Sequence, residues 1–429
     1  MKQRSWSRRR FTGTALLAAG PLVVPGRVLG LDGGVAPSER IVVAGLGIGS
    51  RGRQVMRDFL QQPDVQVVEI CDVQESRRSY AKAEVDGHYG NRDCRVTRDF
   101  YETLERPGVD AVLVATGDRW HALASALAAH AGLDVYCEKP CAMTIGEARA
   151  MARVFEARGR VFQAGTQRRS VENFQYAADL ARSGRLGQLK TLHASILEPS
   201  VEEWDPGVED EPDPSVVDWD RWLGPSPWVP YHSSYLTQWN RHPLFAAAFG
   251  IPDWGVHTLD LCQWAADADD TAPVEFEPGD EGSIMGKYAN GLRVVLRRGG
   301  FANEGDWLGL GTCPVRFEGD EGWVEAGDSG RMEASSESLL EGFAGGSLRG
   351  TDASAHVRDF LDAVRHRGRT RCDAEITRRG HNACQAAAIA WRLGRRVVYD
   401  PENESFPEDA EAEAMRERAL REPWAYPGE

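Results

Sequence analysis

Short apolar runs alternate with more polar, helix-like stretches in the first third of this chain. The runs cover residues 41–44, 65–70, 111–115 and 134–137, and each is apolar along most of its length. This is the pattern of strands that are buried on both faces of a sheet. Helical patterns begin near Arg53 and run from Ala122 to Ala131. The alternation predicts an α/β fold with a parallel, doubly wound sheet.

The first apolar run leads into a glycine-rich turn, residues 45–52, that precedes a helix. Two registers fit the pattern G-x-G-x-x-G: Gly45 and Gly47 with a serine, Ser50, in the last place, or Gly47, Gly49 and Gly52. Glycines let the backbone approach a pyrophosphate, whose charge is favoured by the free N–H groups at a helix start. In either register the turn predicts a dinucleotide site.

The second run ends at Cys71 and Asp72. In dinucleotide folds an acidic residue at this place accepts hydrogen bonds from the hydroxyls of the adenosine ribose, so Asp72 favours NAD. Arg77 and Arg78 are close enough in the sequence to offer a ribose phosphate a partner. NADP is therefore an alternative.

The fourth run is followed by Glu138-Lys139-Pro140, which places one lysine beside a nicotinamide. Further along the chain, Asp253 and His257 are four residues apart, so on a helix they project from one face into the cleft. A histidine suits removal of a hydroxyl proton, and an ammonium group stabilises developing alkoxide charge. The three residues predict oxidation of an alcohol, with His257 as base, Lys139 across the substrate, and Asp253 positioning the lysine or the substrate.

Together these features resemble the Gfo/Idh/MocA oxidoreductases, named for glucose-fructose oxidoreductase and inositol dehydrogenase, over nearly all of residues 38–429. The resemblance rests on the glycine turn, Asp72, Trp120-His121, Glu138-Lys139-Pro140 and the stretches 165–169, 222–225 and 253–260. It implies an N-terminal Rossmann domain, a nicotinamide cofactor in the cleft, and a C-terminal α/β domain on a large, open, mostly antiparallel sheet. Such sheets often mediate oligomers, so a homodimer or homotetramer is expected.

The resemblance also implies the site. The expected catalytic residues are Lys139, Asp253 and His257. The expected cofactor-binding residues are Gly45, Gly47, Ile48, Gly49, Ser50, Arg51, Gly52, Asp72, Thr116, Trp120, His121, Glu138, Lys139 and Gln167. The expected substrate-binding residues are Lys139, Asp253 and His257, joined by Arg168, Tyr231 and Trp239.

Several of these assignments have a structural alternative. The stretch 202–239 is rich in acidic and aromatic residues, which suit a sugar ring but also suit ordinary packing, and Tyr231 and Trp239 come from it. Arg168 and Arg169 reach the cleft or form surface ion pairs, and Asp260 binds a sugar hydroxyl or braces its helix. The family often has a glycine pair or triplet before the aspartate, whereas this chain has Phe249-Gly250-Ile251-Pro252, which leaves the substrate open.

Composition narrows the class of ligand. The formal net charge of −15 and the pI near 5.3 argue against nucleic acid or an anionic membrane as partner, because phosphates would not be neutralised. A small sugar or glycoside is the simpler expectation. The eight cysteines lack paired metal-ligand spacing, so no metal is expected and they are interpreted as mostly buried packing residues.

The N-terminus predicts export. Ser7-Arg8-Arg9-Arg10-Phe11, followed by a modest apolar region to Pro25, is typical of a twin-arginine signal for a periplasmic or cell-envelope protein. The apolar region is too short to span a bilayer comfortably. Because little free dinucleotide exists outside the cytoplasm, the cofactor is expected to be tightly held and recycled internally.

The expected organisation is a signal and linker at residues 1–37, a Rossmann domain at 38–168, a substrate and oligomerisation domain at 169–399, and a wrapping tail at 400–429. Two other functions are open. One is an NAD-dependent glycosidase, working by transient oxidation, elimination, hydration and reduction, which needs a further base such as Tyr231 or Tyr235. The other is a non-catalytic sugar-binding protein, although such a protein has no use for all three of Lys139, Asp253 and His257.

Overall fold

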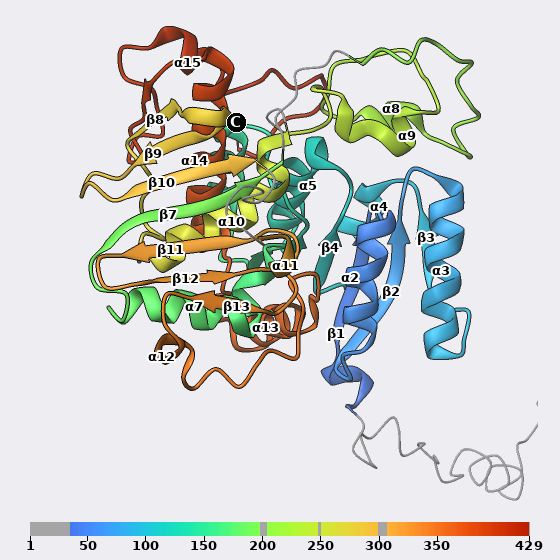
Figure 1. Ribbon diagram of the computed structural model, residues 1–429. Coiled ribbons are helices and arrows are strands. Elements are labelled where there is room, and N and C mark those ends of the chain that lie inside the picture. The colour runs from blue at the N-terminus through green and yellow to red at the C-terminus, as the bar shows by residue number, and fades with distance from the viewer. Residues whose placement is uncertain (1–34, 198–203, 248–249, 299–306, 429) are drawn as a thin grey trace, which may run out of the picture. The chain divides into compact units, whose positions relative to one another are not determined.

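The computed structural model describes residues 35–197, 204–247, 250–298 and 307–428, so the predicted twin-arginine signal, from Ser7 to Pro25, lies outside the described residues. The chain divides into two units, residues 1–40 and 41–429. In the first unit, the described residues contain one 3-10 turn, η3 (Pro37–Glu39). The second unit contains both sheets (Figure 1) and all the residues of the site described below.

The first sheet of this unit has six parallel strands in the order β3-β2-β1-β4-β5-β6. Its strands are β1 (Ile41–Leu46), β2 (Val65–Cys71), β3 (Arg95–Thr97), β4 (Ala111–Val114), β5 (Asp134–Cys137) and β6 (Phe162–Ala164). Its helices are α2 (Ser50–Leu60), α3 (Glu75–Tyr89), α4 (Phe100–Leu104), α5 (Asp118–His130) and α6 (Ile145–Arg158). The predicted doubly wound sheet is confirmed, with the short strands β3 and β6 in addition to the four strands that the apolar runs predicted.

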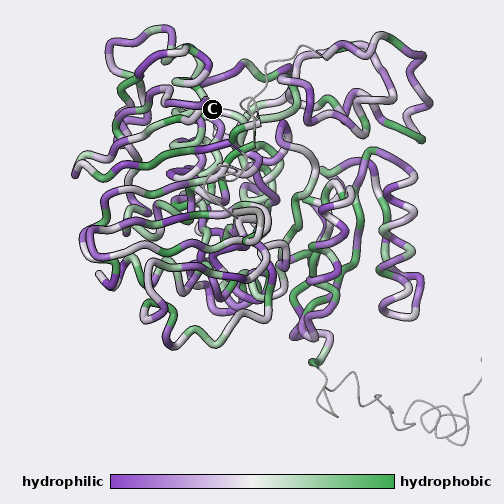
Figure 2. The backbone as a smooth tube through the Cα atoms, in the orientation of Figure 1, coloured by the Kyte–Doolittle hydropathy of each residue, from purple (hydrophilic) through white to green (hydrophobic). Residues whose placement is uncertain are grey.

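Side chains of β4 show how this sheet is buried on both faces. Ala111 and Leu113 pack in a core with α2 and α3, whereas Val112 and Val114 pack in a second core with α5 and α6. Alternation of side chains between the two faces explains why the run is apolar at every position. In Figure 2, β1 and β2 are largely green, whereas α3 at the edge carries more purple.

The second sheet has eight strands in the order β13-β12-β11-β7-β10-β9-β8-β14, and its pairs are antiparallel except for β7 with β10. Its strands are β7 (Leu189–Ile196), β8 (Glu275–Pro278), β9 (Ile284–Lys287), β10 (Arg293–Arg298), β11 (Val315–Gly319), β12 (Trp323–Ala326), β13 (Met332–Ala334) and β14 (Val397–Val398). The other helices of the unit are η4 (Gln167–Ser170), α7 (Glu172–Arg182), α8 (Trp219–Leu223), α9 (Tyr235–Gln238), η5 (Trp239–Arg241), α10 (Ile251–Ala265), η7 (Asp280–Gly282), α11 (Trp307–Leu310), α12 (Glu337–Leu340), α13 (Ser354–His366), α14 (Ala374–Leu393) and α15 (Ala410–Ala414). The large, mostly antiparallel sheet is confirmed.

One face of the second sheet packs against α7, α10 and α14. Alternate residues of β7, such as Leu192 and Ala194, enter a core shared with these helices. Helix α13 instead returns to the first sheet, where Phe360 packs edge-on against Phe59 and Tyr136. Helix α13, although late in the chain, therefore completes the core on one face of the first sheet.

Residues 204–247, the aromatic segment, contain a small core of their own. Trp219, Trp222, Tyr231, Tyr235 and Phe245 are buried against one another. The segment is bonded to the end of β2, because the N–H of Asp218 donates to the carbonyl of Val73 at 3.1 Å. It therefore adjoins the part of the first sheet that the sequence assigns to adenosine.

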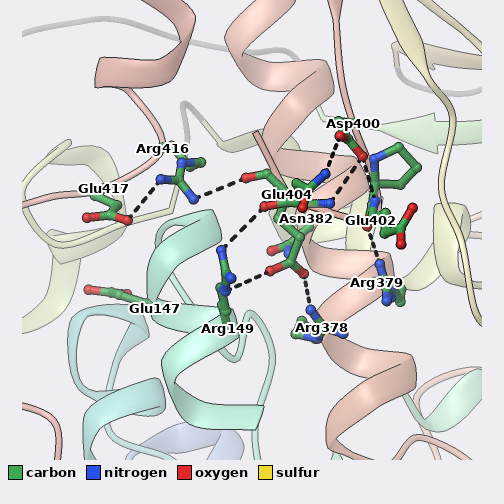
Figure 3. Close-up of polar contacts among 12 residues, drawn as sticks. Glu147, Arg149, Arg378, Arg379, Asn382, Asp400, Glu402, Glu404, Arg416 and Glu417 are labelled. Carbon is green, nitrogen blue, oxygen red and sulfur yellow. Dashed lines mark hydrogen bonds and ion pairs between the residues drawn. The ribbon is translucent and has the colours of Figure 1, made fainter. Parts of the chain in front are cut away.

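The C-terminal tail is held by a buried carboxylate, Glu404, shown in Figure 3. Arg378 and Asn382 of α14 donate hydrogen bonds to Glu404, and Arg149 of α6 forms an ion pair with it at 3.6 Å. Removing one partner of such a buried ion pair is costly, because the other charge is left uncompensated. The network ties the tail to α6 and α14.

Candidate functional site

The glycine turn occupies the loop between β1 and α2. Gly47 has φ +70°, and a Cβ there would lie 2.4 Å from the Cα of Thr116. Gly49 is the N-cap of α2, and a Cβ on Gly52 would lie 2.8 Å from the Cβ of Ala115. Gly47 thus makes the tight turn, Gly49 lets the backbone at the helix start approach a pyrophosphate, and Gly52 lets the helix pack on the sheet. The structure therefore supports the second register of the motif.

Asp72 follows β2 and lines a cavity together with Gly47, Thr116 and Trp120. Its Oδ1 accepts a hydrogen bond from the N–H of Gln74 at 2.9 Å, whereas its buried Oδ2 has no partner in the described part of the chain. Burial raises the pKa of this carboxyl. A buried carboxylate oxygen without a donor is costly, and ribose hydroxyls would supply donors. These residues fit the adenosine half of a dinucleotide.

A second, larger cleft continues from this cavity, since Thr116 and Arg77 line both. Its volume is about 740 Å³. Of the residues expected at the site, it is lined by Gly49, Ser50, Arg51, Gly52, Thr116, His121, Glu138, Lys139, Trp239 and Asp253. The cleft thus joins the glycine turn to the lysine motif, as a nicotinamide dinucleotide requires.

Lys139 and Asp253 meet in this cleft. The ammonium group of Lys139 donates to the carbonyl of Asp253 at 2.8 Å and forms an ion pair with its carboxylate. Asp253 lies in the first turn of α10, after Gly250, the N-cap, and Pro252. The predicted helix is confirmed, and it brings together two residues 114 positions apart.

Two neighbours fix the loop that carries Lys139. Glu138 is buried and accepts a hydrogen bond from Arg51 of α2 at 3.0 Å. The Nδ1 of His121 lies 2.7 Å from the carbonyl of Pro140, which only accepts, so Nδ1 carries the proton. Burial lowers the pKa of His121 to about 4, which keeps the ring neutral. His121 is therefore a neutral donor that orients the loop.

His257 lies one turn after Asp253 but is buried, with 4% of its surface exposed. It is not among the described residues that line the cleft, so the expectation that both side chains project into the open cleft is met by Asp253 alone. Burial lowers the pKa of His257 well below its usual value, and the charges of Arg168 and Lys139 lower it further. Its Nδ1 has no hydrogen-bond partner among the described residues. The ring is therefore neutral and has an unused nitrogen.

The structure adds Asp118, which the motif analysis missed. Asp118 begins α5 and lines the cleft, and its Oδ2 accepts a hydrogen bond from the N–H of Ala247 at 2.9 Å. Burial raises the pKa of Asp118 to about 7, against the opposing effect of Lys139. Its place just after β4, at the carboxyl edge of the sheet, is the signal that could have identified it.

Other expected residues have structural partners. Arg168 forms a buried, two-bonded ion pair with Asp328 at 2.7 and 2.6 Å, and Arg169 forms one with Asp260 at 2.7 Å through both bonds. The alternative of surface ion pairs is wrong, because both arginines are buried. Asp260 braces α10 through Arg169. Gln167 donates to the carbonyl of Gly350 at 2.8 Å.

The two tyrosines expected near the cleft belong to the aromatic segment instead. Tyr231 packs edge-on against Trp219 with ring centroids 5.2 Å apart, and Tyr235 stacks on the same ring at 6.0 Å. Neither is among the described residues that line the cleft. The aromatic-rich stretch forms its own core here, because large rings bury apolar area well against one another.

All eight cysteines are buried free thiols, as expected for packing residues. Within the described ranges, the helices are too short or too polar to cross a bilayer.

Comparison with known proteins identifies the family. The family model described as "Oxidoreductase family, NAD-binding Rossmann fold" matches residues 39–166. The model described as "Oxidoreductase family, C-terminal alpha/beta domain" matches residues 204–308 and 317–426. The chain belongs to the Gfo/Idh/MocA oxidoreductase family. The resemblance inferred from the motifs is therefore confirmed for both domains.

Two curated proteins similar to this chain have names that indicate different activities. The chain is 33% identical to inositol 2-dehydrogenase 2 of Saccharopolyspora erythraea over 154 residues, 35% of this chain and 43% of the relative. It is 26% identical to a glycosyl hydrolase family 109 protein of Stenotrophomonas maltophilia over 198 residues, 44% of this chain and 41% of the relative. The matches span less than half the length of these relatives.

The fold is also similar to that of GenD2 from gentamicin A biosynthesis, solved in complex with NAD. The TM-score is 0.61 with 19% sequence identity, over 86% of this chain and 98% of that one. At this identity the similarity concerns the fold.

Proposed function

We propose that this protein is an NAD-dependent oxidoreductase that acts on a hydroxyl group of a sugar, cyclitol or glycoside. The contact between Lys139 and Asp253, in a cleft that continues from the cavity at Asp72, carries the proposal. Membership of an NAD-binding oxidoreductase family and the similarity to an inositol dehydrogenase support it.

The residues of the cleft divide the work. When bound, the dinucleotide supplies the acceptor or donor of a hydride. Lys139 orients the substrate hydroxyl and stabilises the oxygen as its charge develops. Neutral His257, which is buried one helical turn after Asp253 and does not itself line the cleft, is assigned the hydroxyl proton because its ring has a nitrogen with no partner among the described residues. Asp253 holds the ammonium group of Lys139 until a substrate hydroxyl replaces one of its contacts.

Two contacts favour NAD over NADP. Arg77 donates to the carbonyl of Leu236 at 3.1 Å, and Arg78 donates to the carbonyl of Ser215 at 2.9 Å. Both arginines are thus engaged with the aromatic segment, and a 2′-phosphate would approach the carboxylate of Asp72. Like charges at such a distance repel, so we expect weaker binding of NADP.

We also propose that the protein is exported. Its cofactor is tightly held, and the same or a second substrate returns it to its starting state. Replacing Arg8 and Arg9 with lysine should leave the protein in the cytoplasm, as measured by fractionation. Unchanged export would show that another signal is used.

A homo-oligomer built on the second sheet is part of the same proposal, and gel filtration with light scattering tests it.

An NAD-dependent glycosidase is the second candidate, favoured by the glycosyl hydrolase family 109 relative. It needs a further acid or base in the cleft. Neither tyrosine lines the cleft, but Asp118 does, and its pKa of about 7 suits proton transfer near neutral pH.

A substrate panel separates the two candidates. The purified protein is incubated with sugars, cyclitols and aryl glycosides while nicotinamide absorbance and phenol release are recorded. Reduction of the bound nicotinamide without phenol release supports the oxidoreductase, and phenol release without net redox change supports the glycosidase. Absence of both, with bound dinucleotide present, would contradict an enzymatic role on these substrates.

A further inference from the structure

Arg119 is a buried arginine that the chemistry of the cleft does not use. It is the second residue of α5 and lines the cavity at Asp72. Only 5% of its surface is exposed. Its Nε donates to the carbonyl of Trp222 at 2.8 Å. This side chain therefore connects the start of α5 with the aromatic segment.

The guanidinium carbon of Arg119 lies 3.7 Å from the centroid of the Trp222 ring, which is a cation–π contact. Its buried Nη1 has no hydrogen-bond partner in the described ranges. Burial lowers the pKa of Arg119 to about 9, so the group is still charged at neutral pH. A charged donor that is buried and unpaired is costly, unless a ligand supplies the acceptor.

The same cavity contains an unpaired group of the opposite kind. The Oδ2 of Asp72 is a buried acceptor and the Nη1 of Arg119 is a buried donor, and neither has a partner among the described residues. A ligand that satisfies both must offer a donor and an acceptor on a body that tolerates apolar walls such as Trp120 and Phe100. Adenosine has ribose hydroxyls as donors and ring nitrogens as acceptors.

The aromatic segment forms one wall of this cavity through Arg221 and Trp222. Arg221 forms an ion pair with Asp99 of the first domain at 2.5 Å, and Arg78 bonds to Ser215 on the same segment. The segment is therefore attached to the first domain beside this cavity.

We propose that Arg119 and Trp222 form a clamp on the adenosine half of the dinucleotide, in which Arg119 donates a hydrogen bond to the cofactor and Trp222 holds the guanidinium in place. The proposal rests on the proposed function, since it takes the ligand to be a nicotinamide dinucleotide. It assigns the retention of the cofactor to a contact between the two domains.

The dissociation rate of NADH tests the clamp. The full-length protein is loaded with NADH, an excess of NAD is added, and the loss of bound-NADH fluorescence is followed. Arg119→Leu should release NADH about 10-fold to 100-fold faster, because a charge-assisted hydrogen bond and a stacked cation are lost. The NADH release rate of Arg119→Lys should fall between the rates of Arg119→Leu and the wild type, since lysine keeps the charge without the planar group.

A pair of tryptophan variants supplies the matched control. Trp222 and Trp219 stack on each other at 4.6 Å in one aromatic core, but Trp222 lines the cavity and carries Arg119. Trp222→Phe should speed NADH release, whereas Trp219→Phe should leave it near the wild-type rate. Equal acceleration by both would overturn the clamp, because the effect would then come from general packing.

Binding of half-ligands locates the effect. After removal of the dinucleotide, Arg119→Leu should bind ADP-ribose about 10-fold to 100-fold more weakly and nicotinamide mononucleotide as the wild type does. Unchanged ADP-ribose binding, or equal weakening of both, would overturn the clamp. Wild-type protein that neither retains nor binds NADH would instead overturn the proposed function. Thermal melts of the dinucleotide-free variants show whether folding is affected, and we expect Arg119→Leu to melt no lower than the wild type.

Discussion

The two ends of the proposed site are prepared in different ways. At the adenosine end, the buried atoms Asp72 Oδ2 and Arg119 Nη1 have no partners among the described residues. At the cleft end, Lys139 and Asp253 are paired with each other. Unpaired groups can be satisfied by a ligand that stays bound, whereas a pair whose carboxylate side chain is 47% exposed can exchange partners each time a substrate enters. The difference suits a permanent cofactor and a transient substrate.

Loss of Lys139 or His257, the two residues assigned to charge stabilisation and proton transfer, should have the largest effect. General acid–base and electrostatic groups typically contribute about 100-fold to 10,000-fold, so Lys139→Ala or His257→Ala should cost about 3 to 5 kcal/mol of transition-state stabilisation. Bound nicotinamide should be retained in both variants. Turnover on the identified substrate is the measurement, and Lys190→Ala is the control, because that half-exposed lysine pairs with Asp320 on the second sheet. Near-normal turnover, or loss of the fold, would contradict the assignment.

Asp118 should make stability depend on pH. Its folded-state pKa of about 7 lies above the usual value near 4, so the folded protein binds the extra proton between these pH values. The stabilisation of the folded state by this raised pKa is present in full below about pH 4 and is lost as the pH rises through about 7. As the pH rises over this interval, the free energy of unfolding of Asp118→Asn should therefore increase by up to about 4 kcal/mol relative to that of the wild type.

Urea unfolding at several pH values checks this change, and Asp64→Asn is a control of opposite sign. Although burial raises the pKa of Asp64, hydrogen bonds from Arg358 and Arg365 lower it overall. Asp64 therefore stabilises at neutral pH and loses that contribution only below about pH 4. A pH-independent difference between Asp118→Asn and wild type would show that Asp118 does not titrate in this range.

Replacing Asp72 at the adenosine end should have a smaller effect than the changes above, and that effect should be on the affinity for NADH. Asp72→Asn replaces one acceptor oxygen with a donor, so NADH binding should weaken by about 1 to 3 kcal/mol. Asp134→Asn is the matched control, because Asp134 is also buried but pairs with Arg367 at the opposite end of the first sheet's strands. Equal loss of NADH affinity in the two variants, measured by fluorescence titration, would remove Asp72 from the cofactor site.

Sequence motifs predicted the backbone of the site better than its side-chain contacts. Local patterns specify the strand ends, the glycine turn and the lysine loop, because each depends on residues a few positions apart. The burial of His257 and the pairing of Arg169 with Asp260 depend on elements about 90 residues apart, and no local pattern reports them. Asp118 and Arg119 escaped notice for the same reason, since Ala247 and Trp222 lie more than 100 residues away.

Aromatic residues were the least informative. Tyr231 and Trp239 come from one stretch of similar composition, yet Trp239 lines the cleft and Tyr231 is packed in the aromatic segment. A large ring suits both a sugar and a core, so composition does not distinguish the two.

The nicotinamide content of the purified protein tests the central claim most directly. The protein is isolated without added cofactor and denatured, and the released dinucleotide is quantified by absorbance and mass spectrometry. We expect close to one NAD per chain, with little NADP. A folded protein that contains no nicotinamide and shows no affinity for added NAD or NADH would contradict it.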